Sequence, residues 1–179
     1  MINSDGSGLQ QLTYASNEVT NPVWSPDGTR LAYRNYGSTP SIMRIGKSWR
    51  EQSPEVLPSM SDLSDWYPWS WSHDGRQLAG FRVGAGVSDG ISVYSLESQQ
   101  KEKLTDSGMR PVWLSDSRRM LFQDRGRLYL LDSRSKKIRE VLSVAPNEFG
   151  TGVTLSRDDR LIYFSLVITE ADIWLMTLE

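Results

Sequence analysis

Short runs of β-branched and aromatic residues alternate with polar turns along the whole chain, as in NPVWS, PDG and then RLAYR within residues 21–34. Runs of about four to eight such residues, bounded by Gly, Pro, Asp and Asn, are typical of strands and hairpins. A helix needs apolar residues about three or four positions apart over about ten positions or more. No segment shows that spacing convincingly, so the chain is predicted to be all-β.

One motif occurs four times and sets the period of the repeat. It reads WSPDG at residues 24–28 and WSHDG at 71–75, and returns in altered form as WLSDS at 113–117 and LSRDD at 155–159. The first residues of these motifs lie 47, 42 and 42 positions apart, which is within the range of β-propeller blades. The chain is therefore predicted to be a β-propeller array of four blades.

Each repeat is predicted to fold into a four-stranded antiparallel blade, with the motif as the corner between its first two strands. In such a turn Pro presets φ, the Asp side chain bonds nearby backbone amides, and Gly supplies a positive φ. The residues assigned to this turn are Asp27, Gly28, Asp74, Gly75, Asp116 and Asp158. First strands are expected at 21–25, 68–72, 110–114 and 151–155, and second strands at 30–34, 77–83, 119–124 and 161–166.

The two ends of the chain complement each other. Third strands are expected at 41–45, 91–96, 127–131 and 172–177, and fourth strands at 54–57, 102–105 and 139–142. The last repeat has no fourth strand, but QLT at 11–13, after the turn NSDGSG, resembles one. We therefore expect blade 1 at 21–58, blade 2 at 67–105, blade 3 at 110–142, and a blade that 151–179 shares with 1–13. Sharing would pair the ends and remove open sheet edges.

The first position of the motif is a large apolar residue in every repeat. Side chains that recur at one position of each blade are what packing between adjacent sheets requires. We expect these residues in the core rather than around a ligand. They are Trp24, Trp71, Trp113 and Leu155.

Composition and charge narrow the functional classes. The net charge is −2 and no long basic run is present, so nucleic acid is an unexpected partner. The sequence has no cysteine, which excludes disulfides and thiolate metal sites. No stretch approaches the roughly 20 apolar residues of a membrane span, and MINSDGSGLQQLT lacks the basic and apolar regions of a signal peptide. The compartment is left open.

The candidate chemistry is sparse. The single histidine, His73, lies in the motif turn of blade 2, where a triad would need further groups from other blades. Each motif turn supplies one carboxylate, whereas a calcium loop supplies several. We therefore expect no catalytic residue, no metal site and no cofactor.

The sequences NPVWSPDGTRLAY at 21–33, NSDGSGLQQLT at 3–13 and ADIWLM at 171–176 resemble the repeats of TolB-type propellers, a WD-repeat-like family with a PDG motif. The resemblance covers the whole chain and implies a propeller fold. Relatives include TolB, which binds other proteins of the bacterial envelope, and propellers attached to prolyl-oligopeptidase-type peptidases. The closing ADIWLMTLE also resembles the end of propellers that follow bacterial Ser/Thr kinase domains. If the chain is part of a larger TolB-like protein, a periplasmic or other extracytoplasmic location is implied.

Three arrangements of the four blades fit the sequence. The chain can close as a four-bladed ring, pair with a second copy to form an eight-bladed ring of two-fold symmetry, or belong to a larger propeller. Rings of more than four blades are favoured, because four is the lower limit of the usual range.

The loops that follow strands two and four of a propeller share one face, where partners usually bind. The loop SMSDLSDWYPW at 59–69 is the longest and most aromatic of these, and its Trp66 and Tyr67 have no counterparts in the other repeats. These two residues are expected either to anchor a partner or to plug the end of the channel. The other residues expected on this face are Tyr36, Asp89, Arg110, Asp124, Arg125, Asn147, Phe149 and Glu170.

The sequence thus predicts a recognition or scaffold module that binds a protein or peptide at its loop-bearing face. Two alternatives stay open: a propeller that gates substrate or senses a signal for a peptidase or kinase domain, and a propeller that binds carbohydrate through Trp and Tyr. Fold alone does not choose between them.

Overall fold

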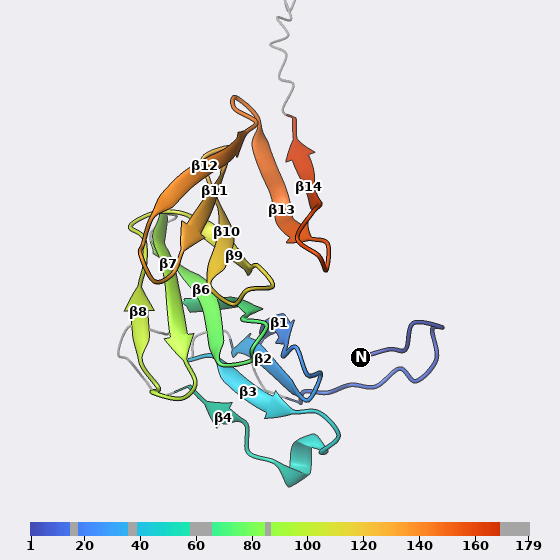
Figure 1. Ribbon diagram of the computed structural model, residues 1–179. Coiled ribbons are helices and arrows are strands. Elements are labelled where there is room, and N and C mark those ends of the chain that lie inside the picture. Colours follow the sequence, from blue (N-terminus) through green and yellow to red (C-terminus); the bar gives the residue numbers. More distant parts are fainter. Residues whose placement is uncertain (15–17, 36–38, 58–65, 85–86, 169–179) are drawn as a thin grey trace, which may run out of the picture.

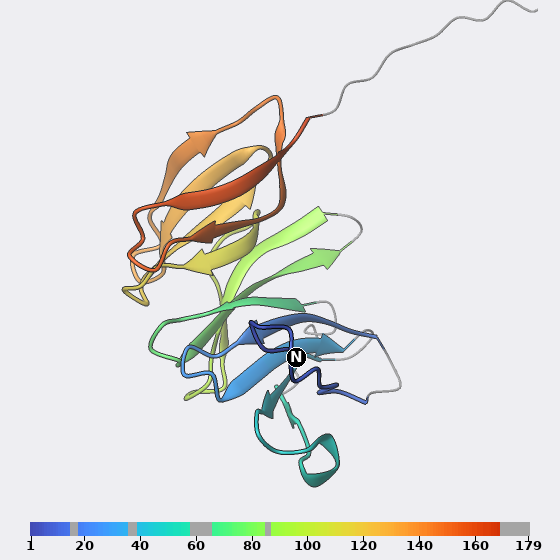
Figure 2. The same ribbon diagram turned by 90° about the vertical axis from the view of Figure 1, so that its right-hand side faces the viewer.

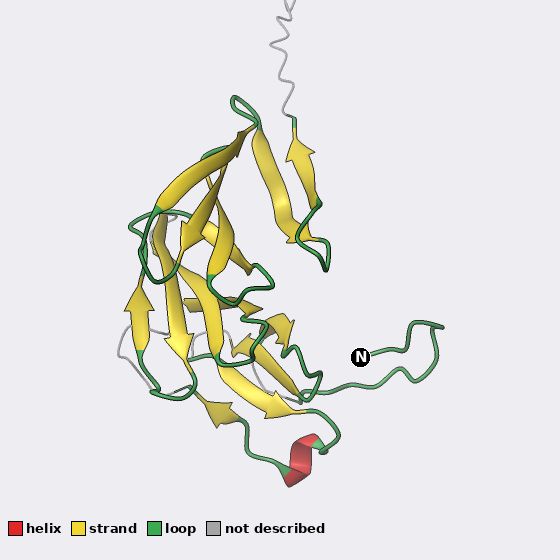
Figure 3. Cartoon of the chain, viewed as in Figure 1, coloured by secondary structure: helices red, strands yellow, loops and turns green. Residues whose placement is uncertain are grey.

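A computed structural model of the protein describes residues 1–14, 18–35, 39–57, 66–84 and 87–168. The strands form separate antiparallel sheets that follow one another along an arc (Figures 1 and 2). Within the described residues, three sheets have four strands and the last has two, and a 3-10 turn at Trp49–Glu51 is the one helical element (Figure 3). No helix in this part of the chain is long and apolar enough to cross a membrane.

Within each sheet, strands that are consecutive in the sequence pair with each other, as expected of propeller blades. Blade 1 comprises β1 (Val19–Trp24), β2 (Arg30–Asn35), β3 (Ser41–Arg44) and β4 (Glu55–Val56). Blade 2 comprises β5 (Trp66–Trp71), β6 (Gln77–Gly84), β7 (Val87–Ser95) and β8 (Lys101–Lys103). Blade 3 comprises β9 (Met109–Trp113), β10 (Arg119–Asp124), β11 (Arg127–Asp132) and β12 (Ile138–Ser143). Blade 4 comprises β13 (Glu148–Leu155) and β14 (Ile162–Val167).

The predicted all-β propeller fold is confirmed, with strands close to the expected positions in all four repeats. The expected third strand of the last blade, at 172–177, lies outside the described residues. Residues 1–13 pair with none of the described strands. A fourth strand would pair with the third, so the shared blade stays a prediction.

The motif turns have the structure that their sequence predicts. Each Asp accepts a hydrogen bond from the backbone N–H two residues further on, because its short side chain reaches back over the turn. The N···O distances are 3.0 Å at Asp27, 3.1 Å at Asp74, 2.9 Å at Asp116 and 3.2 Å at Asp158. The next residue has a positive φ in all four turns, namely Gly28, Gly75, Ser117 and Asp159.

The first residues of the motifs pack between blades at three of the four positions. Trp71 and Trp113 are 6% and 2% exposed, and Leu155 packs with the residues of blade 3. Trp24 is 44% exposed, so its assignment to the core is wrong. Trp71 packs against the blade before its own, whereas no described blade precedes Trp24 in the arc (Figure 1).

Trp66 is also placed differently from the expectation. Its side chain is 0% exposed and packs between blades 1 and 2, and its indole N–H donates to Ser92 Oγ at 2.9 Å. Trp66 is therefore a core residue and neither an exposed anchor nor a plug. The reason lies in β6, where Gly80 takes the position that Tyr33 and Phe122 occupy in blades 1 and 3. The indole fills the space that the glycine leaves, and a Cβ on Gly80 would lie 2.5 Å from it.

The N-terminal residues form an arm beside blade 1 (Figure 2). Leu12 of this arm packs against Leu31, Tyr33 and Met43. These three residues lie on the face of blade 1 that points away from blade 2, since the opposite face, with Ala32 and Ile42, packs on blade 2.

Candidate functional site

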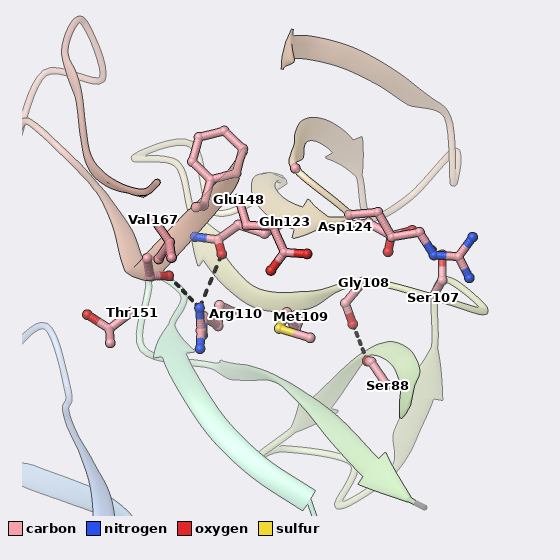
Figure 4. Close-up of a pocket in the computed structure, with 14 residues that line it drawn as sticks. Ser88, Ser107, Gly108, Met109, Arg110, Gln123, Asp124, Glu148, Thr151 and Val167 are labelled. Atoms are coloured by element: carbon pink, nitrogen blue, oxygen red, sulfur yellow. Dashed lines mark hydrogen bonds between the residues drawn. The ribbon is translucent and has the colours of Figure 1, made fainter. Parts of the chain in front are cut away.

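A cavity of about 520 Å³ opens between blades 2, 3 and 4, on the side opposite the motif turns (Figure 4). Its walls come from the loops that follow strands two and four, as the sequence predicts for a binding face, and from the adjoining strand ends. The volume lies within the range of pockets that hold small molecules or a few residues of a peptide. The lining consists of Ser88, Ser107, Gly108, Met109, Arg110, Gln123, Asp124, Arg125, Gly126, Glu148, Phe149, Gly150, Thr151 and Val167.

A bulge in β9 brings Arg110 to this cavity. Register with β10 is regular at Val112 but shifts before Met109, so Arg110 and Pro111 together face one residue of β10. Arg110 adopts a φ of 56°, and such a bulge bends the strand and redirects its side chains. The bulge therefore places the guanidinium of Arg110 in the wall of the cavity.

The guanidinium of Arg110 is held in a fixed orientation. Its Nη1 donates to the carbonyl oxygen of Gly150 at 2.5 Å and to Gln123 Oε1 at 3.4 Å (Figure 4). Its Cζ lies 5.8 Å from the ring centroid of Trp69, close enough for a cation–π contact. Gln123 is buried, so one acceptor comes from the core and the other from the backbone of blade 4. These contacts leave guanidinium N–H groups available to a ligand.

A tight turn places Asp124 and Arg125 on the opposite wall. Asp124 pairs with Arg127 at the end of the β10–β11 hairpin, and the two residues between them, Arg125 and Gly126, have φ of 48° and 70°. Two positive φ values in a two-residue loop match the twist of a hairpin. Asp124 Oδ2 accepts a hydrogen bond from Ser107 Oγ at 2.7 Å, which ties this turn to the loop before β9.

The remaining walls combine charge with apolar surface. Glu148 is exposed and forms no ion pair with another described residue. Phe149 is buried, and its ring packs edge-to-face on Phe164 with centroids 5.3 Å apart. The cavity thus presents a held cation, two carboxylates and an apolar wall.

Four of the residues expected on the binding face line this one cavity: Arg110, Asp124, Arg125 and Phe149. Two more of these residues are not part of the lining. Asp89 is exposed and forms an ion pair with Lys103 at 3.1 Å, and Asn147 follows a turn after β12. Tyr36 and Glu170 lie outside the described residues.

Tyr67 is half-buried rather than displayed as an anchor. Its ring stacks on Phe81 with centroids 5.3 Å apart, and Arg34 Cζ lies 4.2 Å from its centroid. Like Trp66, it contributes to packing around blade 2.

Gln123, Glu148 and the glycines of the cavity wall are not indicated by the sequence pattern. EFGTG resembles a loop, so the pattern predicts a strand that starts at 151, whereas β13 starts at Glu148. The glycines offered a signal, since Gly108 and Gly126 both adopt positive φ beside the cavity. A Cβ on Gly126 would lie 2.5 Å from the carbonyl oxygen of Asn147.

Comparison with known proteins supports the fold. No family model and no curated protein sequence matches the chain. Solved structures do match: TolB from Acinetobacter baumannii superposes with a TM-score of 0.72 at 22% identity, over 91% of this chain and 41% of the TolB chain. This chain therefore spans less than half the length of that TolB.

Two other solved structures show the same fold beside different activities. An oligogalacturonate lyase in complex with manganese matches with a TM-score of 0.68 at 13% identity, over 95% of this chain and 52% of the lyase. The β-propeller domain of the Trilobed protease from Pyrococcus furiosus, which has an open velcro topology, matches at 0.55 and 17% identity, over 74% of this chain and 45% of that one. The chain has the β-propeller fold, like TolB.

Proposed function

We propose that this protein is a recognition module without chemistry of its own, which binds a peptide segment of another protein in the cavity between blades 2, 3 and 4. The observation that carries the proposal is the guanidinium of Arg110, half-buried and held by Gly150 and Gln123 in the cavity wall. A cation oriented before the ligand arrives loses little side-chain entropy on binding. It suits a carboxylate or a backbone carbonyl.

The other walls suit the remaining parts of a peptide. Asp124 and Glu148 can accept hydrogen bonds from backbone amides or from a basic side chain, and Phe149 offers apolar contact. A ligand with donors, acceptors and apolar groups in short succession matches this lining better than a uniformly charged one. A polypeptide offers that mixture, because each residue carries a backbone donor and acceptor next to its side chain.

Two features of the cavity lining support binding without a chemical step. Its two serine hydroxyls are engaged, since Ser88 donates to the carbonyl of Gly108 and Ser107 to Asp124. No histidine lines the cavity, and His73 lies in a motif turn on the other side of the array. A serine nucleophile would need an adjacent base to accept its proton.

The test starts from a phage-displayed library of random peptides selected on the immobilised chain. Enriched peptides are then synthesised and titrated by calorimetry against the wild type and the variants Arg110→Gln and Glu148→Gln. Loss of one charge-assisted hydrogen bond should weaken binding roughly tenfold or more. His73→Ala is the matched control, because His73 is an exposed residue of the opposite side, and it should bind as the wild type does.

The proposal is wrong if no peptide is enriched, or if the enriched peptides bind both cavity variants as tightly as the wild type. Far-UV circular dichroism and melting curves of each variant show whether a loss of binding reflects a loss of folding.

A second candidate function is that of an accessory propeller that gates substrate for a catalytic domain. It is favoured by the likeness to the propeller domain of a protease. A hydrolase or kinase sequence in the same reading frame would support it. Carbohydrate binding can be tested with oligogalacturonate, the substrate named for the similar lyase. Quenching of Trp fluorescence when it is added would favour sugar binding over peptide binding.

A further inference from the structure

The three interfaces between consecutive blades are built from equivalent positions. On the later blade, the first motif residue packs inward, as Trp71 does on blade 1 and Trp113 on blade 2. The indole N–H of Trp71 also donates to the carbonyl oxygen of Val23 at 3.0 Å. The equivalent residue of blade 1, Trp24, is 44% exposed. Blade 1 therefore presents half of such an interface.

The earlier blade contributes a small or apolar residue from its second strand. Ala32 of blade 1 and Ala79 of blade 2 are 0% exposed, and Leu121 of blade 3 packs on blade 4. The equivalent residue of blade 4 is Tyr163, which is 54% exposed. Blade 4 therefore presents the other half of the same kind of interface.

The motif turns repeat the pattern through hydrogen bonds. The residue after the recurring Asp accepts a hydrogen bond from the preceding blade in blades 2, 3 and 4. Arg30 Nη2 donates to Gly75 O at 3.2 Å, Asp74 N donates to Ser117 Oγ at 2.9 Å, and Ser115 N donates to Asp159 Oδ2 at 2.9 Å. In blade 1 this position is Gly28, and a Cβ built there would meet nothing within 4 Å. A third element of the interface is thus open at blade 1.

The N-terminal arm already supplies one part of a preceding blade. Leu57 and Leu104, which follow the fourth strands of blades 1 and 2, pack against the next blade in the array. Leu12 makes the same kind of contact, with Leu31, Tyr33 and Met43 of blade 1. The arm therefore lies where the fourth strand of a blade before blade 1 would lie.

We propose that the blade before blade 1 is completed by the β13–β14 unit of a second copy of this chain. The β14 strand and the arm of a single chain lie at opposite ends of the arc (Figures 1 and 2). The chain superposes on 52% of the oligogalacturonate lyase with 95% of its own length, so two copies together have about the length of that propeller chain. Each copy has the Trp24 surface at blade 1 and the Tyr163 surface at blade 4. Two copies can therefore pair both surfaces and form a closed dimer of two-fold symmetry.

This surface is independent of the proposed peptide function, because Trp24, Gly28 and Tyr163 do not line the cavity. Light scattering after size exclusion should give about twice the 20.3 kDa of one chain. Trp24→Glu and Tyr163→Glu should each return the mass of one chain, since a charge cannot be buried unpaired. Val56→Glu is the matched control: Val56 is an exposed apolar residue of β4, and its variant should stay dimeric.

The absence of cysteine allows a direct test of which surfaces meet. Copies carrying Trp24→Cys are mixed with copies carrying Tyr163→Cys and treated with a short bismaleimide. The proposal expects a covalent pair in the mixture and much less in either variant alone. It also expects that a chain carrying both substitutions is linked to another chain and not within itself.

Three outcomes would overturn the proposal. A wild type with the mass of one chain at about 100 µM, well above the roughly micromolar dissociation constants of weak complexes, excludes the dimer. A ladder of species larger than two chains shows open head-to-tail association in place of a closed ring. An intramolecular link between positions 24 and 163 shows that one chain closes on itself.

Discussion

Gly80 and Trp66 together fill a space in blade 2 that one aromatic ring fills in the neighbouring blades, at Tyr33 and Phe122. Their fit is tight, since a Cβ on Gly80 would lie 2.5 Å from the indole and 2.3 Å from the carbonyl oxygen of Tyr67. Gly80→Ala should therefore lower the free energy of unfolding by roughly 1–3 kcal/mol, as overpacking does. Urea denaturation measures the change.

Two comparisons make that prediction specific. Gly152→Ala is the matched control, because a Cβ at Gly152 would meet nothing within 4 Å, and it should change stability by about 0.5 kcal/mol or less. In a Trp66→Ala background, Gly80→Ala should cost at least about 0.5 kcal/mol less than in the wild type, because contacting residues couple. Equal costs in both backgrounds would contradict the steric explanation.

Asp27 links a single carboxyl to the pH dependence of stability. The hydroxyl of Ser25 and then the backbone N–H and hydroxyl of Thr29 donate to its carboxylate, and they lower its pKa to about 2. A group whose pKa is lower in the folded than in the unfolded state stabilises the fold above its unfolded pKa, about 3.9. That stabilisation is lost as the pH falls through the folded value.

The variant Asp27→Asn should therefore be less stable than the wild type at pH 7, by an amount that stays constant down to about pH 4. Between about pH 4 and pH 2 the difference should shrink, because the wild-type carboxyl becomes protonated. Urea unfolding at a series of pH values measures it. A difference that is independent of pH across this range would show that the carboxylate charge contributes nothing.

At the scale of elements, one motif residue has two environments depending on its blade. Trp71 is enclosed between blades 1 and 2, whereas Trp24 ends the array. Trp71→Ala should cost roughly 3–5 kcal/mol, as large core truncations do. Trp24→Ala should cost about 1 kcal/mol or less in a Tyr163→Glu background, where the chain is kept separate from a second copy. Thermal or urea unfolding of the two variants compares them.

The sequence predicts strands well because the strand and turn signals are local. The four Asp side chains bond backbone within their own turns, and no distant residue is needed to form them. The environments of Trp24 and Trp66 depend on which blade lies opposite, and that information is not local. The same limit explains the site: Arg110 and Gly150 lie 40 positions apart and meet only once blades 3 and 4 pack.

The fold also explains why only four of the ten residues expected on the recognition face line the cavity. Loops after strands two and four share a face, so Arg110, Asp124, Arg125 and Phe149 were expected near one another, and they line one cavity. Asp89 is on that face as well, but it belongs to the outer part of blade 2, where it pairs with Lys103. The strands that a loop connects predict the face on which it lies. Whether its side chains reach the cavity depends on strand register and on bulges, which the sequence pattern does not predict.

At the scale of the whole molecule, an array of blades has a gradient of stability. Blades 2 and 3 pack on both faces, whereas β14 has exposed side chains along its length, including Tyr163, Phe164, Leu166 and Val167. Repeat arrays are stabilised by their nearest-neighbour interfaces, so end units open more easily than central ones. In the Tyr163→Glu variant, amide hydrogen exchange should be slowest in β6 and β10 and fastest in β14.

The protein concentration provides a control for this prediction, because a dimer dissociates on dilution. If a second copy covers β14 and Trp24, the wild type at high concentration should lose the difference in exchange between β14 and the central strands, because no blade is then terminal. Diluting the wild type should restore it, while the Tyr163→Glu variant should show the same gradient at every concentration. Exchange in β14 that is fast in the wild type even at high concentration would mean that no blade packs there. Slow exchange in the dilute variant would mean that the two-stranded blade is stable without a neighbour.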